Sequence, residues 1–207
     1  MAGKQAKILG KSQPDVVLSW LSAHSRNPER DRVLFLLSCK AGLRAGEVAR
    51  LTWSMVSDAE GHVGDCIELP DGIAKMGSGR TIPIGKLLRK ELDALRRRMR
   101  PAPDEPVAFS ERGGYAVGED GRRPKLKAMT PHSMVKWFGR LYHTVGFEGC
   151  SSHSGRRTFV TNAAREIVSV GGSLRDVQQL AGHRNLQTTQ AYIEGSSDAK
   201  RKVVDRI

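Results

Sequence analysis

Residues 153–164 read HSGRRTFVTNAA, and this stretch places a histidine and an arginine at the start of a predicted helix. The apolar residues that follow Arg156 at helical spacing predict a helix that begins near Ser154: Val160, Ala163 and Ile167. His153 lies three residues before Arg156 and therefore on the same side of the helix start. The sequence thus predicts an imidazole and a guanidinium close together.

A second stretch, AGLRAGEVARLTW at residues 41–53, carries another arginine at a helix end. The apolar residues that lead up to this stretch recur at i, i+3, i+4 and i+8, which predicts a helix before it: Val33, Leu36, Leu37 and Ala41. Gly42 stands where the C-terminus of a helix commonly turns left-handed. We therefore expect Arg44 just past a helix end.

A third stretch, LAGHRNLQTTQAYIE at residues 180–194, contains a second histidine and a tyrosine. Ser173 and Asp176 form a capping box that opens the preceding helix, and Gly182 ends that helix immediately before His183. Tyr192 follows nine residues after His183.

The rest of the pattern predicts a mainly α-helical fold with a small antiparallel β-sheet. Further helices are expected from Ser12, over residues 86–100 and from residue 131 onward. Between residues 66 and 84 the apolar period changes around a turn-rich centre, which predicts two paired strands. Residues 101–127 are rich in Pro, Gly and charge and predict a long surface connection that holds a short hairpin.

The composition favours a polyanionic partner. The chain of 207 residues has 34 lysines and arginines against 22 aspartates and glutamates, a formal charge of +12, which suits nucleic acid or an anionic membrane. No apolar run approaches the roughly 18 residues needed to span a bilayer, and the N-terminus lacks the apolar segment of a secretory signal. We expect a cytoplasmic protein without a membrane partner, in which Cys39, Cys66 and Cys150 are free thiols.

Arg44 and Arg156 suit the chemistry of a phosphodiester. A phosphodiester in transfer spreads negative charge over its non-bridging oxygens, and the planar guanidinium can bond two of them at once. A single arginine at a helix end is more often a surface or capping residue. The functional interpretation therefore depends on the three stretches taken together.

In order and spacing, the three stretches resemble the signature boxes of the tyrosine recombinases, the phage integrase family. The resemblance runs from about residue 6 to residue 198 and implies the DNA breaking-rejoining catalytic-domain fold of that family. It also implies a site-specific DNA recombinase, an integrase, invertase or resolvase, that acts through a 3′-phosphotyrosyl intermediate and needs neither a metal nor another cofactor. No phosphate-binding loop or carboxylate cluster of the kind that holds magnesium is evident in the sequence.

The resemblance implies a role for each matching residue. Tyr192 would attack the scissile phosphorus, and Arg44 and Arg156 would hold the non-bridging oxygens. His153 would accept a proton or donate a hydrogen bond near the phosphate, and His183 would donate to a non-bridging oxygen. A phenol is protonated at neutral pH, so such a tyrosine needs nearby cations or a base.

The segment KMGSGRTIPI at residues 75–84 supplies the last catalytic candidate. Lys75 is similar to the family's hairpin lysine, which protonates the leaving 5′ oxygen, whereas a lysine beside a glycine-rich turn is ordinarily solvated. Met76 and Ser78 depart from the glycine and second lysine that are frequent there. Glu47 resembles an acidic residue expected to position basic side chains.

The expected domain plan is a basic N-terminal tail over residues 1–11, mobile in its first ten residues, and a catalytic domain over residues 12–207. The family's usual N-terminal core-binding domain is expected to be absent from this sequence, which resembles either a catalytic domain taken from a longer protein or a naturally minimal enzyme similar in size and plan to the fimbrial phase-variation invertases. Such relatives imply double-stranded DNA as the partner, a homotetramer on DNA, a monomer or weak oligomer when free, and association with the nucleoid.

Two other functions stay open at this point. One is a DNA-binding accessory protein that does not cleave, for which replacing Tyr192 with Phe would change nothing. The other is a relaxing topoisomerase of the related tyrosine type. Lys136 and Arg140, on the helix after Thr130, are candidates for contacting bases, as is Arg80.

Overall fold

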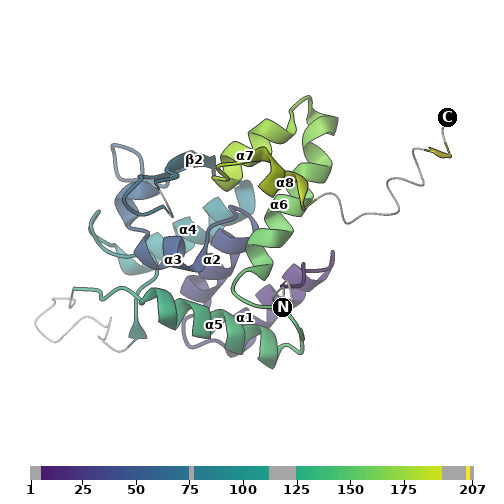
Figure 1. The fold of residues 1–207 in the computed structure, drawn as a ribbon. Helices are drawn as coiled ribbons and strands as arrows, with labels where there is room; N and C mark the ends of the chain where they lie inside the picture. Colours follow the sequence, from purple (N-terminus) through teal and green to yellow (C-terminus); the bar gives the residue numbers. More distant parts are fainter. Residues whose placement is uncertain (1–5, 75–76, 112–124, 193–203, 206–207) are drawn as a thin grey trace, which may run out of the picture.

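The computed structural model describes residues 6–74, 77–111, 125–192 and 204–205. The described part of the chain is mainly helical and holds one small sheet (Figure 1). Its elements follow in chain order as α1 Gln13–His24, α2 Pro28–Cys39, α3 Ala45–Arg50, η1 Trp53–Met55, β1 Cys66–Leu69, β2 Arg80–Pro83, α4 Lys86–Met99, α5 Pro131–Thr144, α6 Ser154–Glu166, η3 Ile167–Val170, α7 Leu174–Ala181 and α8 Leu186–Gln190.

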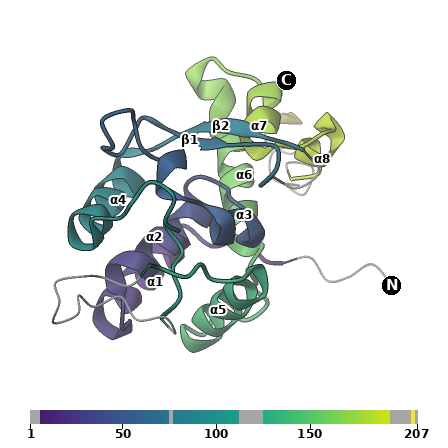
Figure 2. The same ribbon diagram turned by 90° about the vertical axis from the view of Figure 1, so that its left-hand side faces the viewer.

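Helix α2 is the centre of the larger of two apolar cores. It packs against α1, α4 and α6. Consecutive residues of α2, from Val33 to Leu37, are fully buried, so the helix is covered on all sides rather than along the single stripe that the sequence predicted. It also ends at Cys39, earlier than expected, and Gly42 follows with the predicted left-handed φ of +68°. Figure 2 shows α2 between α1, α3 and α4.

The two predicted strands pair as expected. β1 and β2 run antiparallel, with Ile67 opposite Ile82 and Leu69 opposite Arg80. Ile67, Leu69 and Ile82 face the larger core, while the alternating Glu68 and Thr81 are exposed. This register fixes Arg80 at the start of β2, on the side of the molecule where α7 lies.

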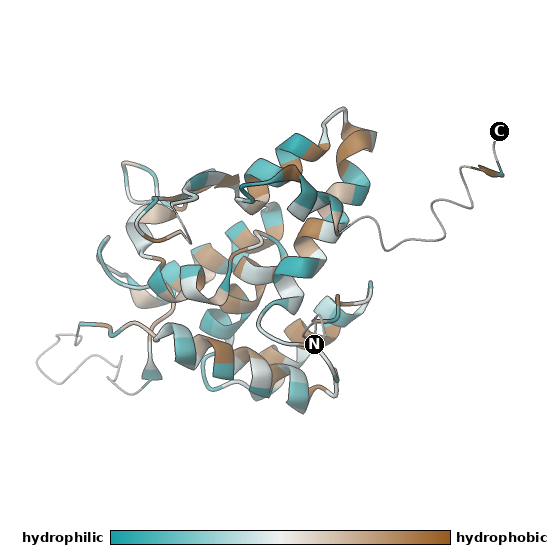
Figure 3. Ribbon diagram, in the orientation of Figure 1, coloured by the Kyte–Doolittle hydropathy of each residue, from teal (hydrophilic) through white to brown (hydrophobic). Residues whose placement is uncertain are grey.

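Helix α5 has the amphipathic character that the sequence predicted. Thr130 caps it by accepting a hydrogen bond from the backbone N–H of Ser133. Its inner face buries an apolar set against the larger core: Met134, Phe138, Leu141 and Tyr142. Figure 3 shows hydrophobic and hydrophilic residues alternating along this helix.

The segment after α4 differs from the surface connection that we expected. Residues 105–109 are buried, and their backbone pairs with two distant segments. The N–H of Val107 donates to the carbonyl of Leu51, and an isolated bridge joins Phe109 to Ala128. Val107, Ala108 and Phe109 are part of the larger core. Burial of these apolar side chains stabilises the segment in spite of its Pro- and Gly-rich surroundings. Residues 112–124 lie outside the described part.

Helix α6 connects the larger core to a second, smaller one (Figure 1). At its start, the Cα of Gly155 approaches α2 so closely that an added Cβ would lie 2.5 Å from Ser38 Oγ. Farther along, Val160 and Ala164 of α6 bury against Val177 and Ala181 of α7. The smaller core therefore packs α7 against the second half of α6.

The N-terminal segment is anchored over residues 6–10, where the sequence predicted a mobile tail. The N–H of Lys7 donates to the carbonyl of Gly149, and that of Leu9 donates to Thr158 Oγ1 at 2.8 Å. Leu9 is buried in the larger core. Ser12 takes the N-cap position of α1 but makes no side-chain cap bond.

None of the described helices is both long and apolar enough to cross a membrane.

Candidate active site

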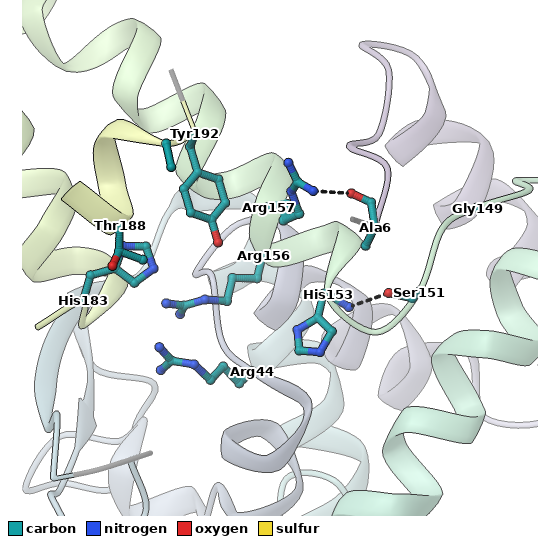
Figure 4. Close-up of a pocket in the computed structure, with 11 residues that line it drawn as sticks. Ala6, Arg44, Gly149, Ser151, His153, Arg156, Arg157, His183, Thr188 and Tyr192 are labelled. Atoms are coloured by element: carbon teal, nitrogen blue, oxygen red, sulfur yellow. Dashed lines mark hydrogen bonds between the residues drawn. The ribbon is translucent and has the colours of Figure 1, made fainter. Parts of the chain in front are cut away.

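One cavity brings together the three stretches that the sequence singled out. It has a volume of about 630 Å³ and lies where the start of α6 faces α8. Figure 4 shows the hydroxyl of Tyr192 and the guanidinium groups of Arg44 and Arg156 directed into the same space. The residues that line it are Ala6, Arg44, Gly149, Ser151, His153, Arg156, Arg157, His183, Thr188, Ala191 and Tyr192.

Arg44 enters this cavity from the N-terminus of α3, a helix that the sequence analysis did not anticipate. Its Nη1 donates to Glu47 Oε1 at 2.8 Å, and its backbone N–H donates to Glu47 Oε2 at 2.9 Å. Glu47 is buried, and it also accepts two bonds from Arg80. Burial alone would raise the pKa of Glu47, but the bonds and charge of Arg80 and Arg44 outweigh it and lower that pKa to about 2. Glu47 thus fixes two basic side chains, as predicted.

Arg156 joins the two cores through its side chain. Only 4% of the residue is exposed, and its Nη1 donates to the carbonyl of Gly42 at 2.7 Å while its Nη2 donates to that of Ala181 at 2.6 Å. Burial, and then the charges of Arg44 and Arg80, lower the pKa of Arg156. Gly42 lies between Ala41 and Leu43 of the larger core, and Ala181 ends α7 in the smaller core. The two hydrogen bonds of Arg156 therefore link the two cores.

His183 lies just past the left-handed Gly182 that ends α7, as the sequence predicted. Its Nδ1 lies 3.0 Å from the hydroxyl oxygen of the buried Thr189. Burial, followed by the charges of Arg156, Arg44 and Arg80, lowers the pKa of His183 to about 4. The imidazole is therefore neutral at physiological pH.

Tyr192 follows α8 and packs between two other side chains. Its ring stacks on that of His183, with centroids 5.6 Å apart and an interplanar angle of 21°. On another side, the guanidinium carbon of Arg157 lies 5.6 Å from the Tyr192 ring centre, and Arg157 Nη1 donates to the carbonyl of Ala6. Arg157 was not predicted as a site residue from the sequence, although it stands next to Arg156 in the same stretch.

The other predicted site residues are distributed differently. His153 is the N-cap residue of α6 and lines the cavity. Lys75 lies outside the described residues. Lys136 and Arg140 are exposed on α5 and do not line this cavity.

Arg80 directs its side chain toward the interior of the protein. Its side chain is 5% exposed, and it bonds Glu47 and the carbonyl of Leu180. A strand's first residue can point inward when a buried carboxylate faces it, as Glu47 faces Arg80 here. Sequence spacing alone did not reveal that Glu47 lies opposite.

The charges of these side chains favour an anion. Arg44, Arg156 and Arg157 line the cavity, and Glu47 pairs with Arg44 and with Arg80. Low exposure of Arg156 keeps water from screening its charge fully. A nucleophilic hydroxyl, two guanidinium groups and neutral imidazole together suit the attack of an oxygen on a phosphodiester.

The fold agrees with comparisons to known proteins. The described structure superposes on a crystal structure of XerA recombinase with a TM-score of 0.68 at 20% identity, over 96% of this chain and 64% of that one. A structure titled XerH site-specific recombinase bound to palindromic difH substrate, post-cleavage complex, also gives a TM-score of 0.68, at 18% identity over 99% and 53%. The fold is that of a tyrosine recombinase catalytic domain.

The sequence gives the family. Residues 12–198 match the phage integrase family, and this chain belongs to it. It is 30% identical over 183 residues to tyrosine recombinase XerA of Thermococcus kodakarensis, a match that covers 86% of this chain and 55% of that protein. The chain thus spans about half the length of the curated relative that it matches.

Proposed function

We propose that this chain is the catalytic domain of a site-specific DNA recombinase that cuts and rejoins DNA through Tyr192. The observation that carries the proposal is the shared cavity: the Tyr192 hydroxyl faces the guanidinium groups of Arg44 and Arg156, which come from three separate parts of the sequence. Family membership over residues 12–198 supports the same reading. So does the XerH neighbour, a site-specific recombinase whose structure is a post-cleavage complex with a palindromic difH substrate.

In the proposed reaction, the Tyr192 oxygen attacks the scissile phosphorus, and the bond from phosphorus to the 5′ oxygen breaks. The phenolic proton passes to a base, for which His153 is the candidate, and the leaving 5′ oxygen takes a proton from Lys75. A 5′ hydroxyl from a second duplex then attacks the phosphotyrosine and releases Tyr192. The phosphodiester energy is kept in the covalent intermediate.

Arg44 and Arg156 would stabilise the charge of the transferring phosphoryl group. A guanidinium has five N–H donors, and the two bonds of Arg156 to Gly42 and Ala181 leave further donors for an anion. These bonds also hold the fork in place before the reaction, so little reorganisation is needed when charge develops. His183 would donate a hydrogen bond to a non-bridging oxygen.

We further propose that residues 12–207 form the catalytic domain and that double-stranded DNA binds over the cavity and the exposed face of α5. Lys136 and Arg140 are exposed there and would contact DNA. Replacing both with Gln should weaken DNA binding and reduce the dependence of log affinity on log salt by about one per lost phosphate contact. Lys90 and Arg97, exposed on α4, provide the matched control pair.

The remaining parts of the proposal concern assembly and location. A recombinase that exchanges strands between two duplexes needs a nucleophile for each strand cut, which favours a homotetramer on DNA and a monomer or weak oligomer without it. Sedimentation with and without a cleavable duplex tests this directly. Its action on cellular DNA would place it at the nucleoid, which fluorescence microscopy of a tagged chain can check.

The main test uses nicked suicide duplexes tiled from DNA that flanks the protein's own gene. Once cleavage releases a short fragment, religation fails, so the covalent complex accumulates and survives denaturant. The proposal expects an adduct with the unaltered chain and none with Tyr192→Phe. Binding of both forms without an adduct would instead indicate a non-cleaving accessory protein, and relaxation of supercoiled plasmid without recombinant products would indicate a topoisomerase.

A further inference from the structure

Thr189 is a buried residue of α8 that contacts two members of the site. Its hydroxyl oxygen lies 3.0 Å from His183 Nδ1, and its backbone carbonyl accepts the N–H of Tyr192 at 3.1 Å. Its exposed fraction is 0%. One turn of a short helix therefore holds both the imidazole and the backbone of the tyrosine.

The direction of the hydrogen bond between Thr189 and His183 decides what the imidazole can do. A neutral imidazole carries one N–H, so one ring nitrogen donates and the other accepts. If Nδ1–H donated to Thr189, Nε2 would present a lone pair to the cavity. A phosphate oxygen, which also presents lone pairs, would then be repelled.

We propose that Thr189 is a positioning residue that donates its hydroxyl hydrogen to His183 Nδ1 and so keeps the ring proton on Nε2. This inference rests on the proposed function, in which Nε2–H donates to a non-bridging phosphate oxygen. Nε2 points away from Thr189, because the two nitrogens of an imidazole are directed to different sides of the ring. His183 itself lines the cavity.

The surroundings of His183 favour a neutral ring, whose single proton can lie on either nitrogen. Burial, and then the charges of Arg156, Arg44 and Arg80, lower the pKa of His183 to about 4. A protonated ring would donate from both nitrogens and would need no partner to choose between them. Since the ring is neutral, the partner at Nδ1 determines the tautomer.

Stacking makes the same ring important for Tyr192. The two rings lie 21° from parallel with centroids 5.6 Å apart. A hydrogen bond at Nδ1 restricts rotation of the imidazole about its bond to Cβ, and it therefore also restricts the face against which Tyr192 packs. Loss of the Thr189 hydroxyl should affect both the hydrogen bond to phosphate and the orientation of the tyrosine.

The test compares Thr189→Val, which keeps the shape but removes the hydroxyl, with Thr189→Ser, which keeps the hydroxyl. Thr161→Val serves as the matched control, since it also alters a buried threonine, but one on α6 and not the one that contacts His183 Nδ1. The primary readout is the ¹⁵N spectrum of ring-labelled histidine at neutral pH, with the His183 signals assigned from a His183→Gln variant. The second readout is the rate of adduct formation on a suicide duplex.

For the unaltered chain and Thr189→Ser, we expect a His183 signal with Nε2 protonated and Nδ1 unprotonated. Thr189→Val should show a mixture of tautomers and form adduct about tenfold more slowly, the effect of one hydrogen bond. Thr161→Val should change neither readout. A proton on Nδ1 in the unaltered chain would overturn the proposal, as would a Thr189→Val spectrum that matches the unaltered one.

The two readouts separate this inference from the proposed function. The tautomer is measured on the folded chain without DNA, so the proposal for Thr189 is tested even if no variant forms an adduct. If Thr189→Val fails to fold, the spectrum of the unaltered chain still decides the position of the proton. Absence of any adduct, with Nε2 protonated as expected, would count against the proposed function alone.

Discussion

Arg80 meets the carboxylate of Glu47 with both ends of its guanidinium, Nη1 to Oε1 at 3.1 Å and Nη2 to Oε2 at 2.9 Å. The pair links β2 to α3, and the Nε of Arg80 extends the link to α7 through the carbonyl of Leu180. Arg44 shares the same carboxylate. One acidic side chain therefore holds two arginines from different elements beside the cavity.

Glu47→Gln should disrupt adduct formation more than it disrupts folding. The amide of Gln is uncharged and has one acceptor oxygen, so it cannot bind the guanidinium groups of Arg44 and Arg80 as the carboxylate does. Arg44 and Arg80 would then lose their fixed positions. We expect destabilisation of up to about 3 kcal/mol and a much slower adduct reaction. Glu91→Gln is the matched control, because Glu91 accepts two hydrogen bonds from the guanidinium of Arg32. Neither Glu91 nor Arg32 lines the cavity. Equal losses of activity in the two variants would contradict a positioning role for Glu47.

Gly42→Ala should destabilise the chain and disturb Arg156. The residue has a φ of +68°, and an added Cβ would lie 2.4 Å from a ring carbon of Phe159. We expect a loss of about 1–3 kcal/mol in the free energy of unfolding, measured with urea. Gly46 lies inside α3, and a Cβ added there would meet no atom within 4 Å apart from the backbone of its own helix. Gly46→Ala should therefore be neutral or stabilising by about 0.4–1 kcal/mol. Similar effects at both glycines would show that the conformation at Gly42 does not matter.

Stability should fall as the pH drops from about 6.5 to about 4 in part because of His183. Its pKa is lowered from 6.5 to about 4 in the folded state, so the unfolded chain binds the extra proton within that window. Acidification therefore favours unfolding there. The melting temperature of His183→Gln should decrease less over this range than that of the unaltered chain, and parallel curves would rule out the buried neutral ring.

Arg157→Met should slow adduct formation by loosening Tyr192. The variant keeps an apolar stem but removes the guanidinium that lies over the tyrosine ring and that bonds Ala6. A cation–π contact contributes at most about 2 kcal/mol, so the rate should drop by no more than roughly thirtyfold. Arg157→Lys restores a cation and should recover part of the rate, whereas a lysine variant as slow as the methionine one would argue against the ring contact.

Much of this architecture can be predicted from the sequence, because helix signals and apolar periods agree with the fold in α4, α5 and α7 and in the strand pair. Gly42 and Gly182 marked the two helix ends beside which Arg44 and His183 lie. The burial of residues 105–109 could not be predicted, since local Pro, Gly and charge suggest a loop while the pairing partners are remote in sequence.

The candidate site was partly predictable for the same reason. The three stretches supplied side chains that line the cavity, although Arg157 was not singled out, and the contacts that hold these side chains depend on tertiary structure. Arg156 bonding two backbone carbonyls and Arg80 turning inward toward Glu47 are examples. Thr189 lay within a stretch already singled out, but only the folded chain brings its hydroxyl to His183.

The central claim is that Tyr192 becomes linked to the 3′ phosphate of the cut strand. Its most direct test labels the two ends of the cleaved strand of a suicide duplex differently, isolates the denatured adduct, and identifies the linked peptide by mass spectrometry after nuclease and protease digestion. We predict that the 5′-end label stays with the protein, that the 3′-end label leaves on a fragment with a free 5′ hydroxyl, and that the modified peptide contains phosphorylated Tyr192. Retention of the 3′-end label, or linkage to any other residue, would contradict the account.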